Sequence, residues 1–175
     1  MIILRDYTNQ REEIVPLLPF MFGIIAPNMR AIAPTGNSVE RDYIIWKKAM
    51  EKDLENPQKH WVMVFAGQEM RLLGYALYRI AMPVLHMDEI QVVKTHQGDG
   101  IVFPALMGKI LHDAEHFGTC TLRSYANKRN EKAFGILRTM GLQILDETET
   151  GYRYEGYLDH ALAWFRWKYH NNQEQ

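Results

Sequence analysis

The sequence predicts a mixed α/β fold in which a sheet is flanked by helices, and two observations support this prediction. Short β-rich runs alternate with longer segments whose apolar residues recur at helical spacing, in the order β, α, α, β, β, β, α, β, α, β, β, α. One strand-helix-strand connection implies a locally parallel pair of strands. No linker divides residues 1–175, so we expect a single domain.

The first strand and the first helix open the chain. Met1–Thr8 alternates as a strand does, and Arg11–Ile25 has the apolar spacing of a helix. Pro16 and Pro19 should kink or split this helix, because proline lacks an N–H and clashes with the preceding turn. Residues 26–38, which contain prolines and a glycine, predict a loop.

A capped helix and a hairpin follow. Val39–Leu54 is amphipathic, and Ser38 is placed to accept a backbone hydrogen bond at its start. His60–Ala66 and Leu72–Ile80 are β-rich runs separated by a short turn that contains glycine. This form predicts an antiparallel hairpin.

The remaining elements alternate between strand and helix. Val84–Val93 predicts a strand, and apolar residues at helical spacing predict a helix from just after Gly100 to a C-cap at Gly118. Trp164 and Trp167 flank the apolar stripe of the last helix, which is typical of a buried core helix or of a homodimer contact. The later elements are strand Cys120–Ala126, helix Asn130–Met140, strands Leu142–Leu145 and Tyr152–Tyr157, and a final helix from Leu158.

Composition narrows the classes of function. The 20 Lys and Arg residues against 21 Asp and Glu residues give a net charge of -1, which supplies no overall attraction for nucleic acid or an anionic membrane. No apolar run approaches the roughly 18 residues that span a bilayer. The single Cys120 cannot form an internal disulfide, and the chain opens on a strand pattern instead of a signal peptide. We therefore expect a soluble cytoplasmic protein with no nucleic-acid or membrane partner.

The segment between Val92 and Phe103 carries the most informative pattern. It leaves a strand, passes Gly98 and Gly100, and opens a helix. A helix start offers unpaired backbone N–H groups and the positive end of the helix dipole, and glycine lets an anion approach closely. The pattern favours a phosphate-binding loop, although glycine pairs before helices also occur in loops with a purely structural role.

This segment resembles the acyl-CoA loop of the GNAT superfamily of N-acyltransferases. That loop is usually written as Arg or Gln, two residues, Gly, one residue, and Gly or Ala, and here Gln97 and Gly100 match it. The last position is Val102, a departure for which Pro104 is a candidate compensation, since proline suits a first helical turn.

A second match lies one helix and one strand downstream. Asn130, Ala133 and Gly141 are similar to the family's Asn, Ala, Tyr, Gly helix motif, and Leu142 replaces an aromatic residue. The tyrosine position of that motif holds Leu137.

The resemblance implies a fold, an activity and a cofactor. The fold is a mixed, mostly antiparallel central sheet flanked by helices, in which the adjacent strands 84–93 and 120–126 splay apart. The activity is transfer of an acetyl group from acetyl-CoA to a primary amine of a small molecule or protein, by direct attack. The implied cofactor-binding residues are Ile90, Gln91, Val92 and Val93 beside the pantetheine arm, Gln97, Gly98, Asp99, Gly100, Ile101 and Val102 around the pyrophosphate, and Asn130 and Ala133 near the far end of the arm.

An amine must lose a proton before or during its attack, so a carboxylate near the acyl carbon is a natural base. Asp88 and Glu89 point to opposite faces of their strand, so only one of them can serve. We expect Glu89, because it stands three residues before Val92, where the family often carries a glutamate. Either acid could instead pair with a nearby Lys or Arg, and His86, on the face of Asp88, is a second candidate base.

Other side chains are weaker candidates. Because leucine occupies the usual tyrosine position, Tyr125 is the candidate general acid, although buried tyrosines in strands usually belong to the core. Tyr43 and Trp46, one helical turn apart, are candidates for the acceptor pocket or for ordinary core. His112 and His116 lie four residues apart on one helical face but lack a third ligand, so we expect no metal.

Three classes of function are consistent with these patterns. The leading one is an acetyl-CoA-dependent N-acetyltransferase. The alternative is a CoA-binding or regulatory domain with weak or lost turnover, which Leu137 and Val102 motivate. A third is an interaction module that uses the C-terminal aromatic helix. The acceptor and the acyl chain length stay open, because acceptor contacts come from loops that vary freely within a fold.

Overall fold

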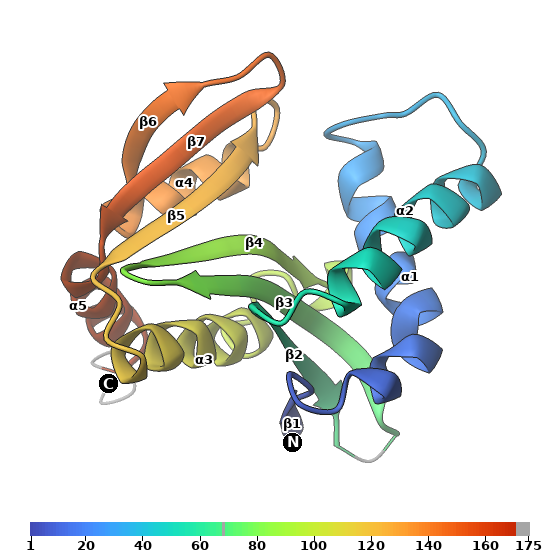
Figure 1. Cartoon of the computed structure of the whole chain (residues 1–175), viewed down its shortest axis with the longest axis horizontal. Helices are drawn as coiled ribbons and strands as arrows, with labels where there is room; N and C mark the ends of the chain where they lie inside the picture. The colour runs from blue at the N-terminus through green and yellow to red at the C-terminus, as the bar shows by residue number, and fades with distance from the viewer. Residues whose placement is uncertain (68, 171–175) are drawn as a thin grey trace. The chain divides into compact units, whose positions relative to one another are not determined.

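A computed structural model describes residues 1–67 and 69–170 of the chain (Figure 1). Within these residues there are seven strands and five α-helices, together with two short 3-10 helices. The strands are β1 (Ile2–Asp6), β2 (Lys59–Ala66), β3 (Arg71–Ala81), β4 (Val84–Val92), β5 (Thr121–Asn127), β6 (Gln143–Glu147) and β7 (Gly151–Tyr157). The helices are η1 (Arg11–Leu17), α1 (Leu18–Arg30), α2 (Val39–Leu54), η2 (Lys94–His96), α3 (Val102–His116), α4 (Glu131–Thr139) and α5 (Leu158–Tyr169).

The strands pair in the order β1-β2-β3-β4-β5-β7-β6, which confirms the mixed α/β prediction. β1 with β2, β5 with β7, and β6 with β7 are antiparallel, whereas β4 and β5, joined through α3, are parallel. The parallel ladder joins Val84–Met87 to Thr121–Ser124, and both strands continue beyond it. At its last pair, the Ser124 hydroxyl donates to the Met87 carbonyl over 3.2 Å.

The chain divides into two compact units. Unit 1 contains Met1–Leu77 and Glu89–Leu106, and unit 2 contains Tyr78–Asp88 and the described residues from Met107 onward. β3, β4 and α3 each contribute residues to both units, so the division does not fall in a linker. The single domain expected from the sequence stays a prediction.

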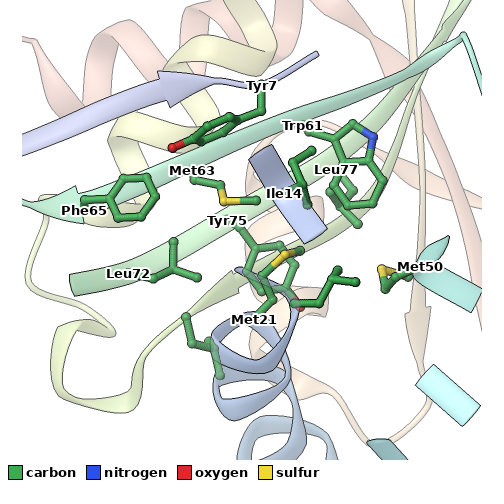
Figure 2. Packing of buried hydrophobic residues seen from close by; sticks show 12 residues of the cluster. Tyr7, Ile14, Met21, Met50, Trp61, Met63, Phe65, Leu72, Tyr75 and Leu77 are labelled. Carbon is green, nitrogen blue, oxygen red and sulfur yellow. The ribbon is translucent and has the colours of Figure 1, made fainter. Parts of the chain in front are cut away.

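Unit 1 has an apolar core between the sheet and the helices η1, α1 and α2 (Figure 2). Ile14 of η1 and Met21 of α1 meet Trp61 and Met63 of β2 and Tyr75 of β3, and all five are fully buried. Burial of one large apolar side chain stabilises a fold by roughly 2 kcal/mol, so this cluster fixes η1 and α1 against β2 and β3.

The first helix is split, as the prolines predict, but it ends later than expected. Pro16 lies in η1, and Pro19 lies at the start of α1. The predicted loop over 26–38 is wrong for its first five residues, because α1 continues through Pro27 to Arg30. An interior proline costs roughly 3 kcal/mol. The hydrogen bonds that Asn28 donates to β4, described below, offset part of this cost and hold the last turn.

The other predicted elements of unit 1 are confirmed within one or two residues. α2 begins after Ser38, whose hydroxyl accepts a hydrogen bond from the Arg41 N–H at 3.2 Å. Phe22 of α1 packs on Tyr43 and Trp46 of α2, with ring centroids 5.1 and 5.5 Å apart. These two aromatic residues therefore belong to the α1–α2 packing.

Unit 2 places helices against strands β5, β7 and β6. Figure 1 shows β6, β7 and β5 side by side with α4 behind them, and Phe134 of α4 packs 5.7 Å from Tyr152 and 6.0 Å from Tyr154 of β7. Trp164 of α5 is buried, as the core interpretation predicts, but Trp167 is 64% exposed. A homodimer contact at α5 stays a prediction.

A buried polar network anchors α3 within unit 2. The Tyr78 hydroxyl donates to Asp113 over 2.5 Å, and the Lys109 ammonium donates to both oxygens of the same carboxylate. Burial raises the pKa of Asp113, but hydrogen bonds from Lys109 and Tyr78 hold this pKa below its usual value. None of the helices formed by residues 1–67 and 69–170 combines the length and apolar character needed to cross a bilayer.

Candidate active site

The glycine loop connects β4 to α3 in unit 1. Gly98 and Gly100 have φ values of +85° and +72°, in the left-handed region that residues with a side chain rarely adopt. A Cβ at either position would meet no atom within 4 Å, so the space above both glycines is open. The loop therefore exposes main chain at the start of a 15-residue helix, as the phosphate-binding interpretation requires.

Asn28 of α1 organises the start of this loop. Its amide donates to Gln91 Oε1 over 2.9 Å and to the Val92 carbonyl over 3.1 Å. The Gln97 amide donates to Asn28 Oδ1 over 3.1 Å and to the same Val92 carbonyl over 3.0 Å. Gln91 and Gln97, two of the expected cofactor contacts, thus use their side chains to tie β4 and the loop to α1. No local pattern marks Asn28 in the sequence.

Asp99 supplies an internal anion at the same loop. Its Oδ1 accepts the N–H of Ile101 at 2.8 Å and that of Val102 at 3.4 Å, and its Oδ2 lies 2.7 Å from His96 Nδ1. Burial raises the pKa of Asp99, but these hydrogen bonds outweigh burial and hold it below its usual value. The Asp99 carboxylate therefore already accepts hydrogen bonds from two of the N–H groups that we expect to bind pyrophosphate.

Val102 stands where the GNAT loop motif has Gly or Ala, and Gly74 of β3 leaves room for its larger side chain. A Cβ on Gly74 would stand 2.9 Å from Val102 Cγ1 and 2.7 Å from the Gln91 carbonyl oxygen, closer than real Cβ contacts. Val102 is fully buried in this space. Pro104 does lie in the first turn of α3, but the room for the valine comes from the neighbouring strand.

Part of the β4 main chain that we expect to face pantetheine already forms hydrogen bonds within unit 1. The Val93 N–H donates to the Leu73 carbonyl over 2.9 Å, and the Val92 carbonyl accepts the Asn28 and Gln97 amides. Ile90, the first residue of the expected stretch, is partly buried.

The two adjacent acids of β4 have different partners. The Tyr75 hydroxyl of β3 donates to Glu89 Oε1, and burial and the charge of Glu89 raise the pKa of Tyr75 well above its usual value. Asp88 instead accepts two hydrogen bonds from Arg79 of β3, at 2.8 and 2.9 Å. The ion-pair interpretation therefore holds for Asp88, and Glu89 is oriented by a buried tyrosine.

A cavity of about 390 Å³ lies in unit 2, and strands β3 to β7 all contribute to its lining. His86, Asp88, Arg79, Arg123 and Tyr125 line it together. Burial and the charges of Arg79 and Arg123 lower the pKa of His86, against the opposing effect of Asp88. The imidazole is therefore neutral at pH 7 and able to accept a proton.

Tyr125, the expected general acid, is 45% exposed and is not a core residue. Its hydroxyl lies 2.6 Å from Thr150 Oγ1. The Asn130 side chain accepts the Ala133 N–H at 3.1 Å and so caps α4, and Leu137 of the same helix is buried. The downstream motif thus has a structural role in unit 2, and its expected contact with the pantetheine arm stays a prediction.

The imidazole rings of His112 and His116 stack on α3 with their centroids 6.2 Å apart. His112 Nδ1 lies 3.3 Å from Asp113 Oδ1. Among the residues that the structure describes, no group of three or more His, Cys, Asp or Glu side chains is arranged to hold a metal ion.

Comparison with solved structures identifies the fold. The PaiA N-acetyltransferase of Thermoplasma acidophilum, solved with coenzyme A, aligns with a TM-score of 0.70 at 13% identity over 90% of this chain and 99% of its own. A protein assigned to the GNAT family of acetyltransferases, from Desulfovibrio desulfuricans, aligns with a TM-score of 0.69 at 12% identity over the same shares. The fold is therefore that of the GNAT acetyltransferases.

A third structure with this GNAT fold is the Campylobacter jejuni N-acetyltransferase PseH with acetyl coenzyme A. It aligns with a TM-score of 0.55 at 18% identity over 90% of this chain and 99% of its own. No protein-family model matches the sequence, and no curated protein does either. At these identities the likeness establishes the GNAT fold alone.

Proposed function

We propose that this protein is an N-acetyltransferase that transfers an acetyl group from acetyl-CoA to a primary amine of a small molecule or protein. The observation that carries the proposal is the loop of residues 97–102, in which two glycines of positive φ open onto a long helix within a GNAT fold. Solved proteins with this fold contain coenzyme A or acetyl coenzyme A.

The loop residues fit the pyrophosphate of CoA. The space above Gly98 and Gly100 is open, and the N–H groups of Ile101 and Val102 already donate to a carboxylate, that of Asp99. When bound, acetyl-CoA supplies a thioester whose thiol leaving group, with a pKa of about 8.5, departs readily near neutral pH. The chain's own residues then need only orient the amine and take up its proton.

We assign the base to His86, with Glu89 as the alternative. His86 lines the cavity together with Tyr125, and its lowered pKa keeps it neutral. Glu89, the base expected from the sequence, accepts the buried Tyr75 hydroxyl and does not line this cavity. Tyr125 stays the candidate donor to the leaving thiolate.

The test is a screen of amines with acetyl-CoA, read by thiol release, together with thermal melting in the presence of CoA. We expect CoA to raise the melting temperature, as a ligand that binds only the folded state does, and at least one amine to accelerate thiol release. No melting shift at millimolar CoA would overturn the proposal.

The second candidate is a CoA-binding domain without turnover. The burial of Leu137, at the position where GNAT proteins usually carry a tyrosine donor, favours it. A melting shift with CoA but no amine-dependent thiol release across a broad screen would select this candidate.

A further inference from the structure

The lining of the cavity in unit 2 is rich in arginine. Three guanidinium groups line it, those of Arg79, Arg123 and Arg153, against two carboxylates, those of Asp88 and Asp146. A third carboxylate, that of Glu155, pairs with Arg123 from outside the lining. Three guanidinium groups but only two carboxylates therefore line the cavity itself.

Acidic neighbours fix the orientation of these arginines. Arg153 donates from Nε and Nη2 to the two oxygens of Asp146, each over 2.6 Å, and Arg123 donates from Nε to Glu155 over 2.5 Å. A guanidinium carries five N–H donors in a rigid plane, so one or two bonds orient it without using all its donors. Oriented guanidinium planes recognise carboxylates and phosphates through paired hydrogen bonds.

The electrostatic effect of the arginines reaches His86 in the cavity lining. Besides burial, Arg79 and Arg123 both act on His86 in the direction that disfavours a positive charge, and Asp88 only partly opposes them. A cationic ligand such as a polyamine would meet the same repulsion. An anionic group would be attracted.

We infer that the cavity binds the acceptor amine through a carboxylate or phosphate group that the same small molecule carries. The inference rests on the proposed function and names its substrate class. The volume of about 390 Å³ is at the lower end of ordinary ligand pockets and suits a small metabolite. Arg123 and Arg153 receive the anionic group, and His86, in the same lining, faces the amine end.

The first experiment measures binding without acetyl-CoA. The probes are matched amines that differ only in an anionic group: phosphoethanolamine against ethanolamine, β-alanine against β-alaninamide, and γ-aminobutyrate against its amide. We expect the member that carries the anionic group to raise the melting temperature of the full chain in at least one pair, and the member without that group to have no effect. Arg123→Gln and Arg153→Gln should each remove that shift.

Arg166→Gln is the matched control. Arg166 also pairs with an acid, Glu115 at 3.6 Å, but lies on α5 outside the cavity lining and is 63% exposed. Its variant should keep the shift. Because the side chains of Arg123 and Arg153 are 44% and 59% exposed, their removal should leave the fold intact, and an unchanged CoA-induced shift checks this directly.

The second experiment compares turnover of the same pairs. We expect KM for the anionic member to be about tenfold lower, which corresponds to about 1.4 kcal/mol of binding free energy, and Arg123→Gln to abolish the difference. If neutral amines are acetylated as well as their anionic partners in all three pairs, the inference is wrong and the proposed function stands. If no amine reacts, the proposed function fails, and the melting shifts alone decide the inference: none from any anionic probe overturns it.

Discussion

We propose anion sites at both the glycine loop of unit 1 and the arginine cavity of unit 2, but their hydrogen-bond donors have different sources. The loop presents main-chain N–H groups at the start of α3, whereas the cavity presents guanidinium groups of side chains from β3, β5 and β7. Each region also contains its own counter-anion: Asp99 in the loop, and Asp88 and Asp146 in the cavity. A ligand at either region must therefore compete with a carboxylate of the protein.

The difference determines how each region can be perturbed. A main-chain donor is removed only by substitution with proline, which also restricts the backbone, so the loop is best altered by blocking its glycines or changing Asp99. The cavity loses charge with each arginine replaced. The two candidate bases also lie in different units, because Glu89 belongs to unit 1 and His86 to unit 2.

The largest expected effect concerns the base. His86→Gln should lower kcat by about 100-fold to 10,000-fold, the usual contribution of a general base, while the melting shift with CoA is kept. Glu89→Gln keeps a hydrogen-bond acceptor for Tyr75 and should be close to normal in turnover. Steady-state rates of both variants with one reactive amine decide between them: loss with Glu89→Gln and normal turnover with His86→Gln would move the base to unit 1.

The next effect concerns the loop. Gly100→Asp places a negative charge where a pyrophosphate is proposed to bind, and like charges in contact cost several kcal/mol, so CoA should bind about 100-fold more weakly. Gly118→Asp is the control, since Gly118 has nearly the same φ, +74°, and equally open surroundings at the other end of α3. Calorimetric titration of CoA into both variants measures the difference. Equal affinities would show that the loop does not hold the pyrophosphate.

A smaller effect of opposite sign is expected at Asp99. Asp99→Asn keeps an oxygen for the Ile101 N–H but removes the charge, and a repulsion of about 1 kcal/mol across a solvated contact corresponds to about fivefold tighter CoA binding. Asp159→Asn, which removes the same charge from the start of α5, should leave the affinity unchanged. Weaker binding by Asp99→Asn would mean that the carboxylate mainly shapes the loop.

The smallest effect is a pH dependence of stability that arises in the cavity. The folded chain holds the pKa of His86 below the ordinary 6.5, so below that pH the unfolded chain binds more protons and acid destabilises the fold. The charged groups that act on His86 are Arg79 on β3, Asp88 on β4 and Arg123 on β5. His86→Gln should flatten the rise of melting temperature between about pH 5 and pH 7. An unchanged slope would mean that other titratable groups cause the pH dependence of stability.

The same contrast explains what the sequence could predict. The conformation of the loop was predictable because glycines before a helix allow positive φ, and Gly98 and Gly100 do have positive φ. The fold was predictable from periodicity and caps such as Ser38. The arginine cavity was not, because Arg123 and Arg153 come together only through the β5–β7 pairing and share no local pattern.

Two further differences arise from tertiary contacts that no single segment encodes. The end of α1 depends on Asn28 reaching β4, which overrides the usual effect of Pro27. The room for Val102 depends on Gly74, a residue of a different strand. In both cases a residue distant in sequence determines the local structure.

The hydrogen bond from Tyr75 to Glu89 makes one tyrosine a spectroscopic reporter of unit 1. The chain has nine tyrosines, and exposed phenols ionise near pH 10, which changes their ultraviolet absorbance. Burial and the adjacent carboxylate raise the pKa of Tyr75 well above 10.0, so its phenolate signal is absent from an alkaline titration while the core of Figure 2 is intact. The difference in absorbance between the wild-type titration and that of Tyr75→Phe should therefore appear only when unit 1 unfolds. The pH at which this difference begins reports the unfolding of unit 1 separately from changes in unit 2.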